Sequence, residues 1–215
     1  MVPVRFTPLT PDRLADELAT WVESLLPGRT RVGIDGATEI GATDLADAVA
    51  EQLRSRGRPV VRASTVWWWR PASLRLEYGH RDLDMLLTGW VDNGSLRREL
   101  LDPLASGGSG DHLARLRDPV TDRSLREPRS RAEPGTILLL DGPLLLAADL
   151  PLDAVVHLQV SSATLGRALA QEDQWWLAGF ERYRSEYGPI QTSEVVIAYD
   201  HPTAPAAAWP RSAEH

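Results

Sequence analysis

Lysine and cysteine are both missing from this 215-residue sequence, and all 23 basic residues are arginine. Without cysteine the chain has no disulfides, no thiol nucleophile and no thiolate metal site. Without lysine it has no compact ammonium charge on a flexible stem. A site that normally needs a lysine must therefore use arginine or lose that charge.

A positive net charge and a long apolar run are also missing. The formal charge is −7, which argues against a nucleic acid or an anionic membrane surface as a partner. No apolar run reaches the length of a membrane span, and the first residues, MVPVRFTP, lack the core of a signal peptide. We therefore expect a cytoplasmic protein with no membrane or nucleic-acid partner.

The hydrophobic pattern alternates between strand-like and helix-like segments. It predicts strands at 31–35, 59–64, 136–140, 154–160 and 195–199, and helices at 11–26, 45–57 and 163–187, with 83–101 mainly helical. Buried strands alternating with helices predict a doubly wound α/β fold with ligands at the carboxyl ends of the strands. We expect one domain over 1–203 and a disordered tail over 204–215. The arginine-rich stretch 112–131 is predicted to be a short hairpin or irregular.

One stretch carries a recognisable ligand-binding motif. A short apolar run ends at Asp35, and Gly36, Gly41 and Thr43 then fit the pattern G-x-x-x-x-G-K-[ST] of a phosphate-binding loop. Position 42 holds alanine where the motif has lysine. Glycines permit the tight turn, and the amino end of the following helix offers free N–H groups to an anion. The backbone part of the motif is present, and its charge is not.

Together with four other blocks, this stretch resembles the uridine kinase-like P-loop kinases of the type common in actinobacteria, over about residues 28–203. The blocks, in chain order, are Val32–Gly36 with Gly41 and Thr43, Arg56–Val60, Leu96–Pro103, Leu139–Gly142, and Val195–Ile197 with Asp200 and Pro202. The resemblance implies a P-loop NTPase, nucleoside-kinase-like three-layer fold with a mostly parallel sheet and a lid near 162–187. It also implies ATP- and Mg²⁺-dependent phosphoryl transfer to a hydroxyl of a nucleoside or similar small molecule.

Three sites depart from the family pattern. Ala42 replaces the lysine that holds the β and γ phosphates, in a loop that also contains Glu39. Where the family has two acidic residues after the second strand, this chain has Val66 and Trp67. Where the family often has an arginine in the lid, it has Gln171. By comparison with a missing arginine finger, losing the lysine charge costs about 4 to 7 kcal/mol of transition-state stabilisation.

Other positions keep chemistry that the resemblance implies. Thr43 and Asp141 are the candidate Mg²⁺ ligands, and Asp141, Arg167 and Arg182 are the candidate catalytic residues; Gly36, Gly41, Ala42 and Thr43 form the candidate nucleotide-binding loop. Simpler interpretations stand beside these. An Asp-Gly pair at a strand end is also an ordinary turn, and helix arginines are more often solvated charges.

A run of tryptophans follows the second predicted strand. Trp67, Trp68, Trp69 and Arg70 are candidates for a substrate pocket. Three consecutive side chains cannot share one face of a strand, so an aromatic-lined pocket, a partner surface and simple burial all stay open. The histidines show no metal-ligand spacing, and His157, in a buried strand, is predicted to be a hydrogen-bonded core residue.

The sequence thus predicts a uridine kinase-like P-loop protein that has lost efficient phosphoryl transfer. Such a pseudoenzyme would act by binding a nucleotide, another small molecule or a protein partner. One alternative is an active transferase in which Arg70, Arg182 or Arg184 replaces the lysine charge. Another is a structural role as a homo-oligomer with an exposed tryptophan interface.

Overall fold

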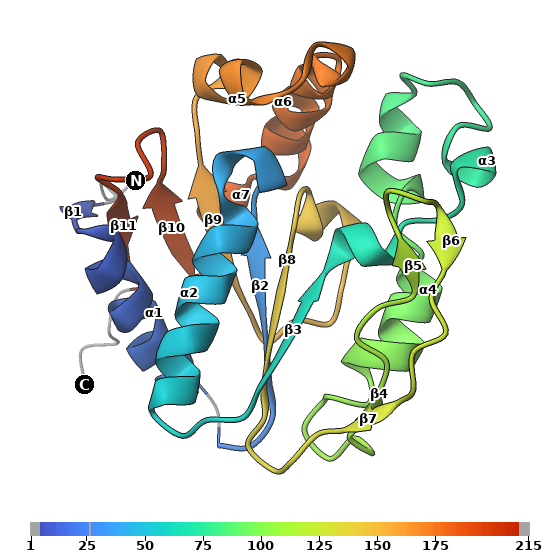
Figure 1. Ribbon diagram of the computed structural model, residues 1–215. Coiled ribbons are helices and arrows are strands. Elements are labelled where there is room, and N and C mark those ends of the chain that lie inside the picture. The colour runs from blue at the N-terminus through green and yellow to red at the C-terminus, as the bar shows by residue number, and fades with distance from the viewer. Residues whose placement is uncertain (1–4, 26, 211–215) are drawn as a thin grey trace.

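Seven strands form one sheet at the centre of the computed structural model, which describes residues 5–25 and 27–210 (Figure 1). Their order across the sheet is β1-β11-β10-β9-β2-β8-β3. The bounds are β1 (Thr7–Pro8), β2 (Thr30–Asp35), β3 (Val60–Ser64), β8 (Ile137–Gly142), β9 (Ala154–Gln159), β10 (Val195–Ala198) and β11 (Ala206–Ala208). The five strands from β3 to β10 pair in parallel, and β11 and β1 add two antiparallel strands at one edge. The predicted α/β fold with a mostly parallel sheet is confirmed.

Both faces of this sheet are covered, which explains the unbroken apolar runs of its central strands. In β8, Ile137 and Leu139 belong to one hydrophobic cluster, while Leu138 and Leu140 belong to another on the opposite face. Successive strand residues point to opposite faces, so a strand buried on both sides needs apolar residues at every position. All six residues of β8 are buried.

Helices form the outer layers. The α-helices are α1 (Pro11–Leu25), α2 (Ala42–Ser55), α3 (Ala72–Arg75), α4 (Asn93–Leu96), α5 (Ser162–Ala168), α6 (Trp176–Tyr187) and α7 (Pro189–Thr192). Short 3₁₀ turns are η1 (Thr38–Ile40), η2 (Thr65–Trp68), η5 (Leu145–Ala148) and η6 (Gln171–Asp173), and π-helical turns are η3 (Met85–Gly89) and η4 (Arg97–Leu101). The helical spacing of Leu14, Leu18 and Val22 buries one face of α1.

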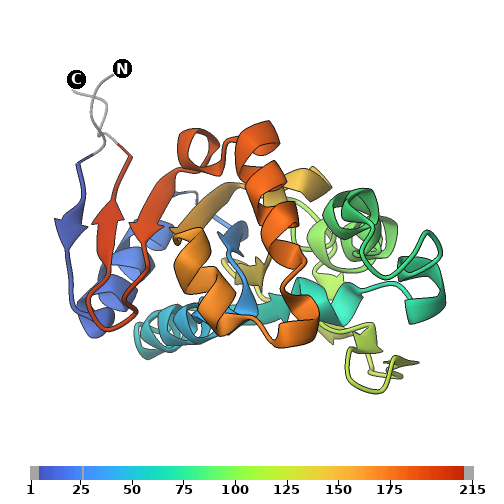
Figure 2. The same cartoon turned by 90° about the horizontal axis from the view of Figure 1, so that it is seen from above.

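The predicted helix over 163–187 is two helices, α5 and α6, with a break between them. The side-chain amide of Gln174 donates hydrogen bonds of 2.8 and 2.9 Å to the carbonyls of Gly166 and Leu169. These bonds satisfy carbonyl groups at the end of α5, where the helix has no partners of its own. The break lets α5 and α6 lie across the carboxyl end of β2, as Figure 2 shows from above.

The prediction of a disordered tail is wrong for Ala206–Ala208. This segment is β11, which pairs with β10 on one side and with β1 on the other. The open edge of a parallel sheet offers unpaired backbone groups to any nearby segment, so pairing here depends on position more than on side chains. Residues 211–215 and Leu26, the predicted end of the first helix, lie outside the described residues.

The arginine-rich stretch between the second and third parallel strands forms small hairpins, in agreement with one of its two interpretations. Strands β4 (Asp111–His112) and β7 (Ser130–Arg131) pair around the inner pair β5 (Arg117–Asp118) and β6 (Arg123–Ser124). In the part of the chain that the structure describes, no helix has both the length and the apolar character to cross a membrane.

Candidate functional site

The loop after β2 keeps the glycine turn that the motif predicts. Gly41 has φ of 94°, a left-handed conformation that side-chain-bearing residues adopt at a cost. Inside the loop, the Ile40 N–H donates to the Ala37 carbonyl at 3.2 Å and the Gly41 N–H donates to the Thr38 carbonyl at 2.9 Å. Two amides of the loop are therefore engaged within the loop itself.

Ala42, at the lysine position, begins α2 with its side chain fully buried in the core. The glycine before it offers no side-chain cap to the helix. The first N–H groups of a helix have no intrahelical partner and carry partial positive charge. This helix end thus keeps its attraction for negative or hydrogen-bond-accepting groups, but it presents no cationic side chain.

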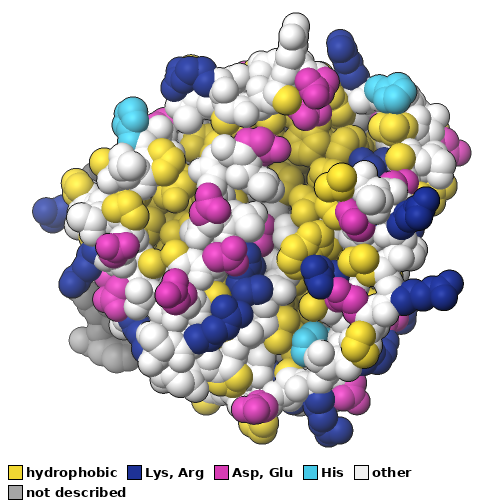
Figure 3. Space-filling model, in the orientation of Figure 1, with side chains coloured by type: hydrophobic (Ala, Val, Ile, Leu, Met, Phe, Trp, Pro, Cys, Tyr) yellow, Lys and Arg dark blue, Asp and Glu magenta, His cyan; other side chains and the backbone are white. Residues whose placement is uncertain are grey.

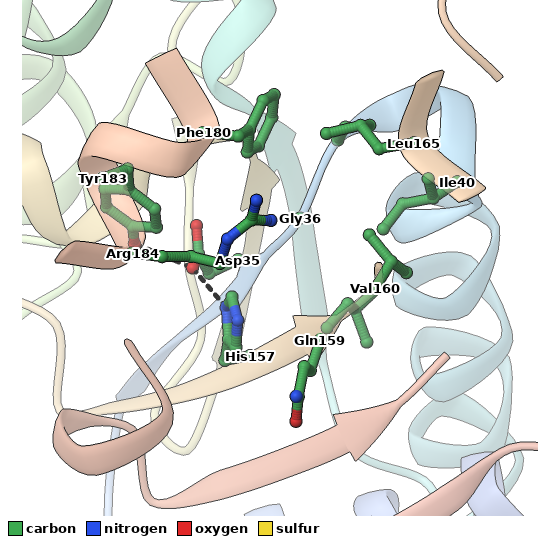
Figure 4. A pocket seen from close by; sticks show the side chains of 12 residues that line it. Asp35, Gly36, Ile40, His157, Gln159, Val160, Leu165, Phe180, Tyr183 and Arg184 are labelled. Carbon is green, nitrogen blue, oxygen red and sulfur yellow. Dashed lines mark hydrogen bonds and ion pairs between the residues drawn. The ribbon is translucent and has the colours of Figure 1, made fainter. Parts of the chain in front are cut away.

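A small cavity of about 20 Å³ lies between the first half of the loop, the end of β9 and α6 (Figure 4). This volume suits roughly one water molecule. Arg184 points into the cavity from α6, opposite Gly36 and Ile40, and donates to Ser162 Oγ at 2.8 Å. Of the three arginines considered as lysine replacements, Arg184 is thus the one beside the loop.

The floor of this cavity is a buried polar cluster. Asp35 accepts hydrogen bonds from His157 Nδ1 at 2.7 Å, from the Tyr183 hydroxyl at 2.8 Å and from the Leu145 N–H at 2.9 Å. Burial, and then the Asp35 charge, raise the pKa of Tyr183, so its phenol stays protonated as a donor. The prediction of a hydrogen-bonded core histidine at His157 is confirmed. The sequence analysis did not identify Tyr183. The available signal was Asp35, a buried carboxyl at a strand end, which needs several hydrogen-bond donors.

Asp141 lies at the carboxyl end of β8 and is fully buried. Its Oδ2 accepts hydrogen bonds from Thr43 Oγ1 at 2.8 Å and from Ser64 Oγ at 2.9 Å. Its Oδ1 pairs with the guanidinium of Arg62 at 2.8 Å, and Arg62 also binds Asp47 at 2.7 Å. The carboxylate is thus neutralised and fully hydrogen-bonded by side chains of this chain.

The structure brings Thr43 and Asp141 together, and the oxygens of both are engaged by side chains of this chain. Magnesium requires near-octahedral oxygen ligands at about 2.0 to 2.1 Å. Here the two oxygens are joined by a hydrogen bond, and Arg62 already supplies the positive charge beside the carboxylate. Within residues 5–25 and 27–210, no group of three or more His, Cys, Asp or Glu side chains is arranged to hold a metal.

A larger groove, of about 580 Å³, runs along the second half of the loop to the end of β10. Its lining residues are Glu39, Ile40, Gly41, Asp44, Thr164, Arg167, Ala168, Tyr199, Asp200 and Pro202. Arg167 donates to Thr164 Oγ1 at 3.0 Å. Hydrogen bonds from Thr164 and from the Ser161 N–H hold the pKa of Asp200 below its usual value, so this carboxyl is ionised in neutral solution. Gly41 and Arg167, both predicted site residues, share this groove.

Two other predicted site residues lie elsewhere. Arg182 pairs with Asp84 at 2.6 Å and with Glu186 at 2.7 Å, and it lines neither of these two cavities. These ion pairs account for its charge without a ligand. Arg70 also lines neither cavity; its carbonyl accepts a hydrogen bond from Arg75 Nε at 2.8 Å.

The three consecutive tryptophans have three different surroundings. Trp68 is completely buried in the core, and Trp67 lies beneath the guanidinium of Arg115, which is 5.2 Å from its ring centre. Trp69 joins an aromatic cluster in which Trp90 and Trp176 contact edge to face at 5.1 Å. This cluster links the segment after β3 to α6. Figure 3 shows hydrophobic side chains gathered in the hollow between these parts of the molecule.

The tryptophan run therefore does not form an exposed interface. Among the described residues, the large hydrophobic side chains that are exposed are Leu74, Tyr78 and Val120. Consecutive residues of the 3₁₀ turn η2 point in different directions, which separates Trp67 from Trp68. The substrate-pocket assignment of the run stays a prediction.

Three solved structures share the fold of this chain. A Bacillus stearothermophilus protein described as a possible uridine kinase aligns over 85% of this chain and 96% of its own, with a TM-score of 0.69 and 21% identity. A Silicibacter protein described as a candidate fructose transport system kinase aligns over 86% of this chain and 95% of its own, with a TM-score of 0.58 and 18% identity. The YGR205w protein aligns over 94% of this chain and 100% of its own, with a TM-score of 0.56 and 9% identity.

No protein-family model and no curated protein sequence matches the chain. At these identities the structural similarity establishes the fold, which this chain shares with proteins described as a possible uridine kinase and a candidate fructose transport system kinase. The resemblance inferred from the sequence is confirmed at this level. Because one fold supports many activities, the activity has to be argued from the site.

Proposed function

We propose that this chain is a P-loop kinase-fold protein that binds a small molecule in the groove beside its loop and lacks efficient phosphoryl transfer. The observation that carries the proposal is Ala42, whose side chain is fully buried at the position of the catalytic lysine. Since the chain contains no lysine, no other part of it supplies an equivalent ammonium group.

Phosphoryl transfer in this fold depends on positioning and on positive charge around the β and γ phosphates. Losing one such charge lowers the rate by about 10³ to 10⁵, judged from the effect of an arginine finger. Besides lacking the lysine charge, the loop carries the negative charge of Glu39, which is exposed on the groove side. Both changes act against binding and transferring a triphosphate.

The acidic groups that the reaction needs are also changed. Asp141 is paired with Arg62, so it is not free to share a magnesium ion with a phosphate oxygen. Val66 and Trp67 stand where the family has two acids, and their side chains cannot accept a proton from a substrate hydroxyl. Without these acidic groups, the fold favours ligand binding over phosphoryl transfer.

One observation favours the alternative of a rebuilt active site. Arg184 points toward the first half of the loop, where a guanidinium could take over part of the lysine charge (Figure 4). Under this alternative, Arg184→Ala abolishes both ATP binding and turnover. Under the main proposal, this substitution changes neither by more than about twofold, because there is little of either to lose.

The deciding experiment is an ATP-dependent phosphorylation assay with the full chain, Mg²⁺ and a panel of nucleosides and sugars. A working P-loop kinase in the same buffer serves as the positive control. We expect turnover below about 10⁻² per second with every acceptor, given ordinary kinase rates of about 1 to 100 per second. A turnover of about 1 per second with any acceptor would overturn the proposal.

A further inference from the structure

A second small cavity, also of about 20 Å³, lies where the segments after β3 and β8 meet the start of α4. Its walls include Thr65 of η2, Leu86 and Leu87 of η3, Asn93 of α4, and Leu144 and Leu145 of the loop after β8. A cavity needs about 10 to 15 Å³ on this measure to hold one water molecule. There is therefore room for one water and for no larger ligand.

Two polar atoms at this cavity have no hydrogen-bond partner among the residues that the structure describes. One is the hydroxyl oxygen of Thr65, a side chain that is only 1% exposed, and the other is Oδ1 of Asn93. The two side chains line the same cavity but do not hydrogen-bond to each other. Buried polar groups in native proteins are nearly always paired, so both atoms call for a partner in the space between them.

The place of the Thr65 hydroxyl is determined by the fold. In the sheet, Ser64 pairs with Asp141, and the next residue, Thr65, packs on Gly142. The three atoms nearest to a Cβ built at position 142 all belong to the Thr65 side chain, and its hydroxyl oxygen is the first of them. Gly142 thus leaves the space that the hydroxyl occupies at the edge of the cavity.

We propose that this cavity is a binding site for one water molecule, which bridges the Thr65 hydroxyl and the Asn93 side-chain oxygen. Water can donate to the Asn93 oxygen and can either donate to or accept from the Thr65 hydroxyl. A cation is disfavoured, because the remaining walls are rich in leucine and burying a charge there costs far more than burying a neutral molecule. This site does not depend on whether the chain transfers phosphate.

The bridge has a positioning role. Thr65 is the first residue of η2, the turn that carries Trp67 and Trp68, and Asn93 is the first residue of α4. The two segments are already joined by the backbone, since the Asp92 N–H donates to the Trp68 carbonyl at 2.7 Å. The water adds a side-chain link to this contact and holds the tryptophan turn against α4.

The test is oxygen-17 magnetic relaxation dispersion of the full chain in enriched water, which counts long-lived internal waters. Thr65→Val keeps the shape of the side chain and removes its hydroxyl, so the count should fall by one. Thr65→Ser retains the hydroxyl and should retain the water. Thr88→Val is the matched control: Thr88 lines the same cavity, but its hydroxyl already donates to the Asp84 carbonyl at 2.9 Å, so the count should not change.

A thermal measurement checks that Thr65 and Asn93 share one ligand. Thr65→Val and Asn93→Leu should each lower Tm by about 2 to 6 °C, because each leaves the other polar atom unsatisfied. The double variant should lose clearly less than the sum, since no unpaired polar atom then remains at the cavity. Losses that add up fully would contradict a shared water.

A crystal structure of the unmodified chain keeps the proposal testable even if Thr65→Val fails to fold. Electron density for one water within hydrogen-bond distance of both Thr65 Oγ1 and Asn93 Oδ1 would support it. A cavity without such density, a direct hydrogen bond between the two side chains, or an equal water count in the unmodified chain and Thr65→Val would overturn it.

Discussion

Thr43 donates a 2.8 Å hydrogen bond to Asp141, although the two residues are 98 positions apart in the chain. The contact joins the start of α2 to the carboxyl end of β8. The same carboxylate pairs with Arg62 at 2.8 Å, so its charge is neutralised by a side chain of this chain.

Replacing Arg62 by methionine should destabilise the protein strongly. The substitution leaves Asp141 buried and unpaired, and breaking a buried ion pair in this way costs about 3 to 5 kcal/mol. Because the Arg62 side chain is itself 14% exposed, we expect a loss at the lower end of this range. Urea unfolding at neutral pH should show the free energy of unfolding reduced by about 3 kcal/mol.

The matched control for this measurement is Arg13→Met. Arg13 forms an exposed pair with Glu17 one turn along α1, and water screens such pairs, so their contribution to stability is small. Equal losses in the two variants would contradict a structural role for the Arg62–Asp141 pair.

Magnesium should not stabilise the protein. A site with a Kd of 100 µM would add about 2.7 kcal/mol at 10 mM Mg²⁺, which corresponds to a rise in Tm of about 5 to 10 °C for a chain of this size. We expect a change below about 1 °C between 10 mM MgCl₂ and EDTA, because Arg62 occupies the charge position beside Asp141. A shift of several degrees that disappears in Thr43→Val would show a metal site.

Gly41→Ala should cost about 1 to 2 kcal/mol of stability, because φ of 94° strains any residue with a Cβ. The space around Gly41 is not the obstacle, since the nearest atom to an added Cβ is 3.6 Å away. Gly94→Ala, in α4, is the control and should be neutral or stabilising by about 0.5 kcal/mol, as expected for a helical glycine. If both variants have the same stability, the left-handed loop conformation is not needed.

Alkaline pH should reveal the role of Tyr183. Folding raises the pKa of its phenol through burial beside Asp35, so its stabilising contribution is complete below the ordinary value of 10.0 and is lost as the pH rises beyond it. Tyr183→Phe should lower stability by about 1 to 3 kcal/mol at pH 8, and the difference should shrink above pH 10.

The absence of lysine simplifies the pH dependence, because no lysine titrates in the same range as tyrosine. Between pH 9 and 11, tyrosine is the side chain expected to titrate in this chain, since it contains neither lysine nor cysteine. Tyr78→Phe, at an exposed position, is the control and should show the same pH dependence as the unmodified protein. A constant difference between Tyr183→Phe and the unmodified protein at all pH values would contradict the assignment.

The parallel part of the fold could be predicted because its local and tertiary signals agree. Runs such as Ile137–Leu140 need burial on both faces, and glycine spacing between β2 and α2 defines the loop. The edge strands β1 and β11 could not be predicted, because two or three residues containing proline and alanine have little strand preference of their own. Their pairing follows from the open edge of β10.

The candidate site could be predicted only in part. Motif spacing identified Gly41 and Thr43, the family resemblance added Asp141, and the structure joins Thr43 to Asp141 by a hydrogen bond. Motif spacing could not identify Arg62, because a charged residue in the middle of a strand gives no indication of the carboxylate it reaches on the neighbouring strand. Tyr199 was missed for a similar reason: a tyrosine at a strand end is common, and nothing in the sequence shows that it lines the groove beside Gly41.

The most direct test of the central claim, a kinase fold that no longer transfers phosphate, is ³¹P NMR of Mg-ATP mixed with the full chain and a nucleoside acceptor. The three phosphate resonances report contact with the loop, and the appearance of ADP reports transfer in the same sample. We expect unshifted β and γ resonances and, over hours, no more ADP than forms without the protein. Shifted β and γ resonances with ADP formed at about 1 per second or faster would contradict it.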